Sequence, residues 1–216
     1  MTAMTFQLES GPAAGPCHLL LAHGAGAGIT SPFLESLAEL LAARGIHAVR
    51  FEFDYMAAWR TGGTRRPPPR AETLTGSYAA TAAALRERIG KGARLFIGGK
   101  SLGGRVASLI ANDAYLAGHI SGCVCLGYPF HPPGKPEKLR TAHLAQITCP
   151  TLIVQGTRDP FGSQTEVENM RLAPAVGLHW IGDGDHDFGP RGASGYTRTG
   201  NLAAAADAVA AFVAGH

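Results

Sequence analysis

The 216-residue chain has little that would point to a membrane or to a nucleic acid. No apolar run approaches the roughly 20 residues that a membrane-spanning helix needs. Charged residues make up only 16% of the chain, and the net charge of +3 is too small to indicate a nucleic-acid partner. Residues 1–10 lack the basic start and the apolar run of a secretory signal. We therefore expect a cytoplasmic protein with neither a membrane nor a nucleic acid as its partner.

Cysteine is also scarce. The chain has four, Cys17, Cys123, Cys125 and Cys149, and the nearest two are separated by one residue, which is not a metal-binding spacing. We expect reduced, mostly buried thiols and neither a metal site nor a disulfide framework, as in cytoplasmic proteins.

Hydrophobic residues make up 45% of the chain, enough for one globular domain that spans residues 1–216. Apolar runs bounded by glycine or proline predict strands at 17–22, 47–53, 122–127, 151–156 and 176–181, with a further strand that begins at Arg94. Helical spacing predicts helices at 31–45, 74–89, 163–170 and 202–213, and another directly after Ser101. We expect a turn-rich lead-in at 9–15, a loop from 54 to 70, and an irregular segment at 128–149 with at most a short helix around Leu144.

Strands that alternate with helices predict an α/β fold, a doubly wound and mostly parallel sheet with helices on both faces. In such a sheet the functional site lies at the carboxyl ends of the strands. The loops that follow the strands are therefore the places to search.

Residues 99–103 read Gly-Lys-Ser-Leu-Gly and lie between a predicted strand and a predicted helix. This sequence fits G-x-S-x-G, the nucleophile elbow, a sharp turn that exposes the hydroxyl of Ser101. The Gly-Lys-Ser part also ends the phosphate-binding loop G-x-x-x-x-G-K-[ST]. That loop needs a glycine where Arg94 stands, and its spacer would fall inside the strand, so we favour the elbow.

A serine hydroxyl needs a base to take its proton and an acid to orient the base, and α/β-hydrolases supply them in the order Ser, Asp or Glu, His. Asp159 follows the strand at 151–156, and His186 follows the strand at 176–181. An acid before proline is also a common turn residue, so Asp159 has a structural alternative. The order of the three side chains favours a Ser101–His186–Asp159 triad.

Other histidines and acids have simpler explanations. His18, His47 and His179 fall inside strands, where we expect structural roles. The acidic cluster at 183–187 could suggest calcium, but it lacks the glycine and the glutamate that an EF-hand loop requires. We expect no metal there.

The glycine-rich loop at 23–28 follows the first predicted strand. In α/β-hydrolases such a loop gives one backbone donor to the oxyanion, and the residue after the nucleophile gives the other. We expect the amides of Leu102 and Ala25 in these roles, with Gly26 as the next choice for the loop. A dinucleotide fingerprint is the alternative, but Ile29 stands in place of its third glycine.

Along the chain, the glycine-rich loop, the elbow, the acid and the histidine come in the order that α/β-hydrolases use. The chain therefore resembles the α/β-hydrolase superfamily over nearly its whole length. Residues 127–140 and 156–162 look like a small bacterial branch related to testis-expressed protein 30 and the third subunit of the NSL acetyltransferase complex, and more distantly to dienelactone hydrolases. The resemblance implies a compact serine hydrolase without cofactor. Dienelactone hydrolases use a cysteine nucleophile, so Ser101 argues against dienelactone as the substrate.

The segment at 128–149 is too short for a cap domain, so we expect an open site for small acyl esters, with thioesters or peptides as alternatives. A non-catalytic interaction module on the same scaffold is the competing class. We expect His23, Lys100, Tyr128 and Arg158 near the substrate mouth. Ten basic residues in predicted loops could attract an anionic substrate, although we favour the simpler explanation that these loops are polar and solvated: Arg60, Arg65, Arg66, Arg70, Lys135, Lys138, Arg140, Arg158, Arg191 and Arg198.

Overall fold

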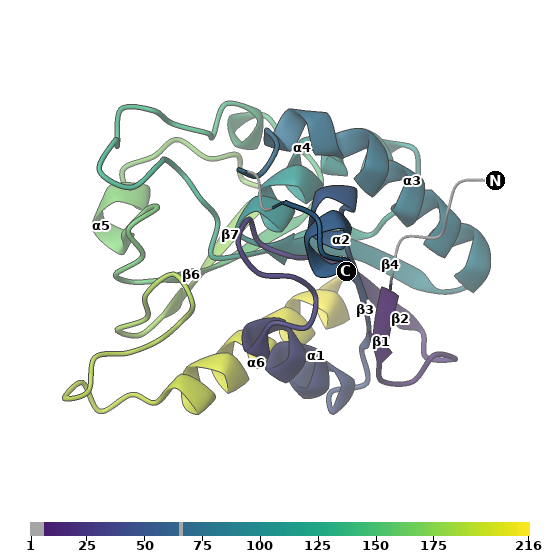
Figure 1. The fold of residues 1–216 in the computed structure, drawn as a ribbon, viewed down its shortest axis with the longest axis horizontal. Coiled ribbons are helices and arrows are strands. Elements are labelled where there is room, and N and C mark those ends of the chain that lie inside the picture. The colour runs from purple at the N-terminus through teal and green to yellow at the C-terminus, as the bar shows by residue number, and fades with distance from the viewer. Residues whose placement is uncertain (1–6, 65–66) are drawn as a thin grey trace.

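The computed structural model describes residues 7–64 and 67–216, and its centre is a seven-stranded sheet (Figure 1). The strand order is β1-β3-β2-β4-β5-β6-β7, and every neighbouring pair is parallel except β1 with β3. The strands are β1 (Gln7–Ser10), β2 (Cys17–Ala22), β3 (His47–Phe51), β4 (Arg94–Lys100), β5 (Gly122–Leu126), β6 (Thr151–Gly156) and β7 (Val176–Ile181). The predicted doubly wound, mostly parallel α/β fold is confirmed.

Helices cover both faces of the sheet. They are α1 (Pro32–Ala42), α2 (Asp54–Arg60), α3 (Ala71–Ile89), α4 (Leu102–Leu116), α5 (Gln164–Val167) and α6 (Arg198–Gly215), with one 3-10 turn at His143–Ala145. Helices α1 and α6 pack together on one face, and α3 and α4 pack on the other (Figure 1). Each face therefore has its own apolar core.

The core beneath α3 and α4 also holds the strand that leads to the elbow. Tyr78 of α3 is fully buried, and its hydroxyl accepts a hydrogen bond from the Gly98 amide at 2.8 Å. The same hydroxyl lies 2.6 Å from the Gly98 carbonyl oxygen. A buried phenol needs such a partner, because an unpaired hydroxyl in an apolar core is costly. Tyr78 thus fastens α3 to β4 three residues before Ser101.

Helix α1 begins as its sequence predicts. Ser31 is the N-cap, its side-chain oxygen accepts from the Leu34 amide at 3.4 Å, and Pro32 follows as the first helical residue. The fixed φ of proline suits that position, where no intrahelical partner for the amide exists. The helix ends at Ala42, slightly before the predicted end near Gly45.

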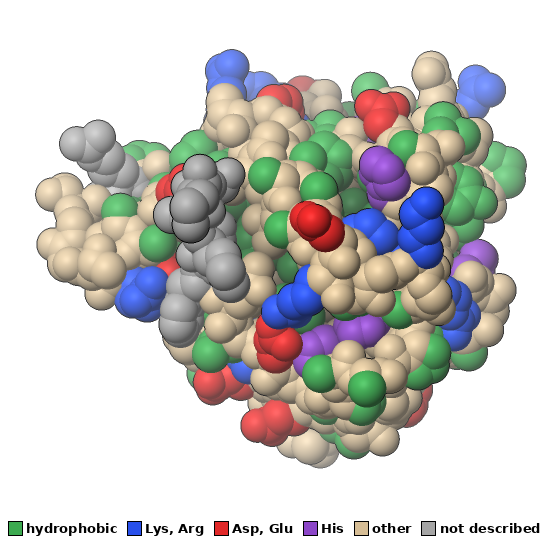
Figure 2. Space-filling model, turned by 90° about the vertical axis from the view of Figure 1, so that its right-hand side faces the viewer, with side chains coloured by type: hydrophobic (Ala, Val, Ile, Leu, Met, Phe, Trp, Pro, Cys, Tyr) green, Lys and Arg blue, Asp and Glu red, His purple; other side chains and the backbone are tan. Residues whose placement is uncertain are grey.

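The turn-rich lead-in predicted at 9–15 is wrong at its start, because β1 occupies Gln7–Ser10. Contacts distant in sequence hold this edge strand. The Glu9 carboxylate accepts from His47 Nε2 of β3 at 3.0 Å and from Arg88 Nη1 of α3 at 2.6 Å. The His18 ring lies 5.1 Å from the His47 ring. On the face of the molecule shown in Figure 2, histidine side chains lie beside acidic and basic ones. No local pattern in the sequence signals such contacts.

The loop predicted from 54 to 70 is also wrong in part. Helix α2 occupies Asp54–Arg60, so Arg60 lies in a helix and not in a loop. Seven residues are too few to establish a helical period, and only Met56 of this helix is buried. Arg65 and Arg66 lie outside the described residues.

Three further elements have boundaries that differ from the predictions. The strand predicted at 47–53 ends at Phe51, and the helix predicted at 163–170 is only the single turn α5, which Ser163 and Glu166 cap reciprocally. Likewise α6 begins at Arg198, before the predicted start at 202.

Between β5 and β6, residues 127–150 contain one 3-10 turn around Leu144 and no other helix or strand. No cap domain is inserted at this point, as predicted. All four cysteines are buried free thiols. In the part of the chain that the structure describes, no helix combines the length and the apolar character that crossing a bilayer requires.

Burial makes part of the stability sensitive to acid. It lowers the pKa of His18, His23 and His143, that of His143 to about 4. A histidine whose pKa falls on folding is stabilising as the neutral form. Its contribution is present above the unfolded pKa of about 6.5 and is lost as the pH falls through the folded pKa. We expect the free energy of unfolding to decrease as the pH falls from about 6.5 to about 4.

Urea unfolding at a series of pH values measures this decrease. His143→Gln keeps a donor for Ser108 Oγ, which lies 2.9 Å from His143 Nε2, but does not titrate. In this variant the free energy of unfolding should decrease less steeply as the pH falls. His119→Gln, at an exposed histidine, should follow the wild type. An equally steep loss in His143→Gln would contradict the prediction.

Candidate active site

Ser101 lies in the turn between β4 and α4 with a backbone that few residues adopt. Its φ is +51° and its ψ is −111°. A non-glycine residue with such angles costs on the order of 1–3 kcal/mol and persists only where its surroundings hold it. The Ser101 amide donates to the Leu126 carbonyl at 2.9 Å, and its carbonyl accepts from the Arg105 amide at 3.0 Å. Strand β5 and helix α4 therefore hold the strained turn from both sides.

The glycines of the motif allow strand, loop and helix to come this close. A Cβ on Gly99 would lie 2.4 Å from the Ala22 carbonyl oxygen, and one on Gly103 would lie 2.5 Å from the same atom. Both distances are shorter than any tolerable contact, and the clashing atom is backbone that cannot turn away. Alanine at either position would displace β2 or α4 and with it the Ser101 side chain.

One chain of hydrogen bonds joins the three predicted side chains. Ser101 Oγ lies 2.9 Å from His186 Nε2, and His186 Nδ1 lies 2.8 Å from Asp159 Oδ2. Because an ionised carboxylate only accepts, the Nδ1 proton belongs between His186 and Asp159. Nε2 is then free to accept the proton of the serine hydroxyl.

Asp159 is completely buried, and donors surround its carboxylate. In addition to His186, Oδ1 accepts from the Phe161 amide at 2.8 Å and Oδ2 from Gln155 Nε2 at 3.0 Å. The Gln155 side chain also accepts from the Tyr128 amide at 2.7 Å, so it ties the loop after β5 to the acid. Buried carboxylates need such partners. Sequence reasoning missed Gln155, since nothing in the next-to-last residue of strand β6 signals this role.

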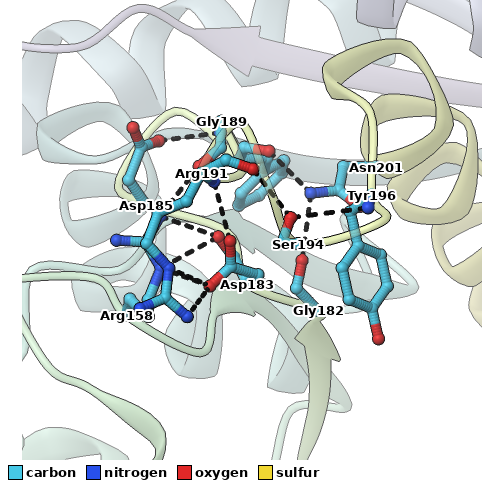
Figure 3. Close-up of polar contacts among 10 residues, drawn as sticks. Arg158, Gly182, Asp183, Asp185, Gly189, Arg191, Ser194, Tyr196 and Asn201 are labelled. Carbon is cyan, nitrogen blue, oxygen red and sulfur yellow. Dashed lines mark hydrogen bonds and ion pairs between the residues drawn. The ribbon is translucent and has the colours of Figure 1, made fainter.

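The loop that carries His186 is braced by an arginine next to the acid (Figure 3). The Arg158 guanidinium donates to the Asp183 carbonyl at 2.9 and 3.1 Å and pairs with Asp183 Oδ1 at 2.8 Å. Asp183 Oδ2 also accepts from the Arg191 amide at 2.7 Å. The loops after β6 and β7 are therefore joined beside the Asp159–His186 contact.

The same loop is closed internally and fastened to α6 (Figure 3). Asp185 Oδ1 accepts from the amides of Asp187 and Gly189, at 2.9 and 2.8 Å. From α6, Asn201 Nδ2 donates to the carbonyl of Phe188 at 2.8 Å. The acids at 183 and 185 thus hold the loop. Among the residues that the structure describes, no group of three His, Cys, Asp or Glu side chains is arranged to hold a metal ion.

A cavity of about 510 Å³ lies beside Ser101 and His186. Its wall combines aromatic rings, glycine-rich backbone and three charged side chains: Gly24, Ala25, Gly26, Ala27, Ser31, Pro32, Phe33, Lys100, Ser101, Phe161, His186, Asp187 and Arg198. The Phe161 ring lies against the His186 ring, with 4.3 Å between their centroids. Sequence reasoning did not identify Phe33, Phe161 or Asp187 as part of this wall.

The expected backbone donors lie beside the serine. Ala25 and Gly26 line the cavity, and a Cβ on the neighbouring Gly24 would be 3.8 Å from Ser101 Cβ. Leu102 is the first residue of α4, where the amide has no intrahelical acceptor.

His23 and Tyr55 fix the direction of the loop amide. The Gly24 carbonyl lies 2.7 Å from His23 Nδ1 and 3.3 Å from the Tyr55 hydroxyl. His23 Nε2 accepts from the Phe53 amide at 3.1 Å, so its Nδ1 carries the proton that Gly24 accepts. In a trans peptide the N–H points away from the C=O, and these two contacts therefore direct the Ala25 amide away from His23.

Three of the four residues predicted at the substrate mouth have structural positions instead. His23 and Tyr128 are fully buried, and the Tyr128 hydroxyl donates to the Arg140 carbonyl at 2.8 Å. Arg158 is turned toward Asp183. Only Lys100 of the four lines the cavity. The prediction for the other three did not allow for the hydrogen bonds that draw their side chains away.

The basic residues predicted in loops are spread more widely than expected. Eight of those ten lie in the described part of the chain, and of these eight Arg198 lines the cavity. Among the described residues, the positive charge in the cavity wall therefore comes from Lys100 and Arg198 and not from a general rim of basic loops.

The strained serine between strand and helix, with an acid and a histidine at the ends of later parallel strands, defines the α/β-hydrolase class of fold. A family model described as an alpha/beta hydrolase domain matches residues 16–214, so the chain belongs to this hydrolase family.

Solved structures agree with this fold. An alpha-beta serine hydrolase homologue from Coxiella burnetii is 18% identical, with a TM-score of 0.67 over 98% of this chain and 97% of that one. A dienelactone hydrolase from Anabaena variabilis is 21% identical, with a TM-score of 0.71 over 97% and 91%. A serine hydrolase without a lid from Xanthomonas campestris is 17% identical, with a TM-score of 0.58 over 87% and 88%. At these identities the likeness concerns the fold.

The contacts of Asp183 with Arg158 and Arg191 should make the thermal stability of the protein depend on pH. Hydrogen bonds from Arg191, with the nearby Arg158 charge, hold the pKa of Asp183 well below its usual range. An acid of this kind stabilises the fold above its unfolded pKa of about 4, and the contribution is lost as the pH falls through the folded pKa. Asp183→Asn should therefore lower the melting temperature at neutral pH, and its difference from wild type should shrink below about pH 4.

Thermal unfolding at neutral and acidic pH checks this, with Asp113→Asn, at an exposed acid, as the matched control. A deficit in Asp183→Asn that stayed constant down to the lowest pH would show that charge is not the cause.

Proposed function

We propose that the protein is a serine hydrolase that cleaves small acyl esters through Ser101, His186 and Asp159. The observation that carries this proposal is the unbroken chain of hydrogen bonds from Ser101 Oγ to the buried Asp159 carboxylate. A serine packed only for structure needs neither a strained backbone nor a histidine oriented by a buried acid. The arrangement supports nucleophilic catalysis.

In the proposed mechanism, Ser101 Oγ attacks the acyl carbon while its proton passes to His186 Nε2. Asp159, on the opposite side of the ring, stabilises the imidazolium that forms. His186 then returns the proton to the leaving alkoxide as the ester bond breaks, which leaves an acyl group on Ser101. Water, deprotonated by His186, attacks this acyl-enzyme and releases the acid.

The oxyanion of each tetrahedral intermediate needs donors that are already in place. We assign the amides of Leu102 and Ala25 to this role, with Gly26 as the next choice for the loop. The contacts of His23 and Tyr55 with the Gly24 carbonyl support this assignment, because they orient the peptide unit that carries the Ala25 amide.

The substrate class follows from the access to the cavity. No cap domain covers the cavity, so an ester can reach Ser101 directly from solvent. Such an open site suits a carboxylesterase-like enzyme that acts on small esters. The resemblance of residues 127–140 and 156–162 to the branch of testis-expressed protein 30 supports a compact enzyme of this kind. A thioester would undergo the same steps, and rates on matched oxygen and sulfur esters would rank the two substrates.

Labelling by a fluorophosphonate probe tests the nucleophile. Wild type should be labelled and should hydrolyse a short p-nitrophenyl ester, because His186 activates the Ser101 hydroxyl. In Ser101→Ala the labelling should disappear and kcat should fall by about 10⁴-fold or more.

Ser77→Ala, at a half-buried serine of α3, is the matched control and should be labelled like wild type. Equal labelling of wild type and Ser101→Ala would refute the mechanism. An unlabelled wild type would favour the interaction module on a hydrolase scaffold.

Replacement of the acid tests how the base is oriented. Asp159→Asn keeps the size of the side chain but removes the acceptor that holds the proton on His186 Nδ1. We expect kcat to fall by about 10⁴-fold with a much smaller change in KM, because the favoured tautomer of His186 can no longer accept from Ser101. Steady-state kinetics measure both constants, and circular dichroism checks that the variant is folded. A folded variant with nearly normal kcat would place the orienting role elsewhere.

A further inference from the structure

Positive charge dominates the wall of the cavity beside Ser101. Two basic side chains, Lys100 and Arg198, line it, against one acidic side chain, Asp187. The catalytic acid, Asp159, is buried behind His186 and does not line the cavity.

Lys100 is the closer cation in sequence to the nucleophile and is unusually buried. It is 6% exposed, and its ammonium lies 3.2 Å from Asp187 Oδ1 and 5.3 Å from the centre of the Phe33 ring. Burial lowers the pKa of Lys100, whereas the carboxylates of Asp187 and Asp159 raise it. The side chain of Asp187 is 58% exposed, so water weakens its hold on the ammonium. An ammonium has three donors, and one exposed carboxylate does not satisfy them all.

A purely structural role for Lys100 is the simpler alternative, in which it only fastens Asp187 and the His186 loop. That role would leave Arg198 unexplained. Arg198 is the first residue of α6, where the helix dipole is positive and an arginine is unfavourable. Its side chain is exposed and forms no ion pair or hydrogen bond with a described residue. Water solvates this exposed guanidinium, and its place in the cavity wall leaves it available to an anionic group that enters the cavity.

A third source of positive potential faces the same cavity. Ser31, Pro32 and Phe33 line it where the eleven-residue helix α1 begins. The amino end of a helix carries a partial positive charge and favours anions. It adds to the two cations and is not by itself a binding site.

We propose that the substrate of this enzyme is an anionic ester, whose carboxylate is held by Arg198 and attracted by Lys100 while Ser101 attacks its acyl carbon. The planar guanidinium can donate two parallel hydrogen bonds to a carboxylate, and the ammonium of Lys100 adds a second positive charge in the wall of the same cavity. The rings of Phe33 and Phe161 would contact the carbon chain between the two ends. This inference rests on the proposed serine hydrolase activity and names the class of ester.

Matched pairs of esters test the inference. Mono-p-nitrophenyl adipate and p-nitrophenyl hexanoate have the same acyl length and differ in a terminal carboxylate. 4-Carboxyphenyl acetate and phenyl acetate place the same difference in the leaving group. With each rate divided by that of hydroxide-catalysed hydrolysis, wild type should favour the anionic member of one pair by about tenfold in kcat/KM, and added salt should reduce this preference.

Variants assign the preference to its residues. Arg198→Gln should reduce the anionic-to-neutral ratio by about fivefold, and Arg198→Lys should retain part of it. Arg171→Gln, at an exposed arginine outside the cavity wall, is the charge-matched control and should keep the wild-type ratio. Lys100→Met should lower the ratio further when it is combined with Arg198→Gln.

The two proposals can fail separately. If the neutral esters are hydrolysed in a manner that depends on Ser101 but neither anionic ester is preferred, this inference is wrong and the serine hydrolase stands. A preference that survives in Arg198→Gln would also overturn the role of Arg198. If wild type is not labelled and no ester of either kind is hydrolysed, the proposed function fails and this inference fails with it.

Discussion

The close approach of strand, loop and helix at the elbow is the constraint on which the rest of the site depends. The carbonyl of Ala22 occupies the space that a side chain at Gly99 or Gly103 would need. That contact holds β2, β4 and α4 so near one another that the chain must turn sharply at Ser101 and take a positive φ. The same approach brings the loop after β2, with Ala25, alongside the serine. The positions of Ser101 and of the expected oxyanion donors therefore have one origin.

A second constraint is the burial of Asp159. An ionised carboxylate can be buried only if donors replace its water, and here Gln155, Phe161 and His186 do so. These donors come from β6, from the loop after it and from the loop after β7. Solvation of one acid thus fixes the relative position of two loops, and the Arg158–Asp183 contact adds a second link between them. Most of the polar residues around the site bind the backbone or side chains of these loops and hold them in place. Few of them are therefore available to contact a substrate.

Local patterns made much of the fold and site predictable. Short apolar runs bounded by glycine indicated the parallel strands, and the cap formed by Ser31 and Pro32 indicated α1, because these features depend on neighbours in sequence. The elbow could be recognised because its glycines and serine lie within five residues, although the carbonyl for which Gly99 and Gly103 leave room belongs to the distant Ala22. Asp159 and His186 could be named because parallel strands place their carboxyl ends at one edge, so the order of loops along the chain implies proximity.

What the sequence by itself determined is therefore the order of elements and the place of Ser101, Asp159 and His186 at the ends of strands. The tertiary structure decided which other side chains meet them. Strand β1 is held by its pairing with β3 and by contacts of Glu9 with distant residues. Gln155, Phe161 and Asp187 reach the site from positions without a local signal. His23, Tyr128 and Arg158 turn away from the cavity because buried carbonyls and acids elsewhere claim their donors. The direction of a side chain depends on the partners that folding brings next to it. Because these partners are distant in the sequence, a local sequence pattern does not identify them.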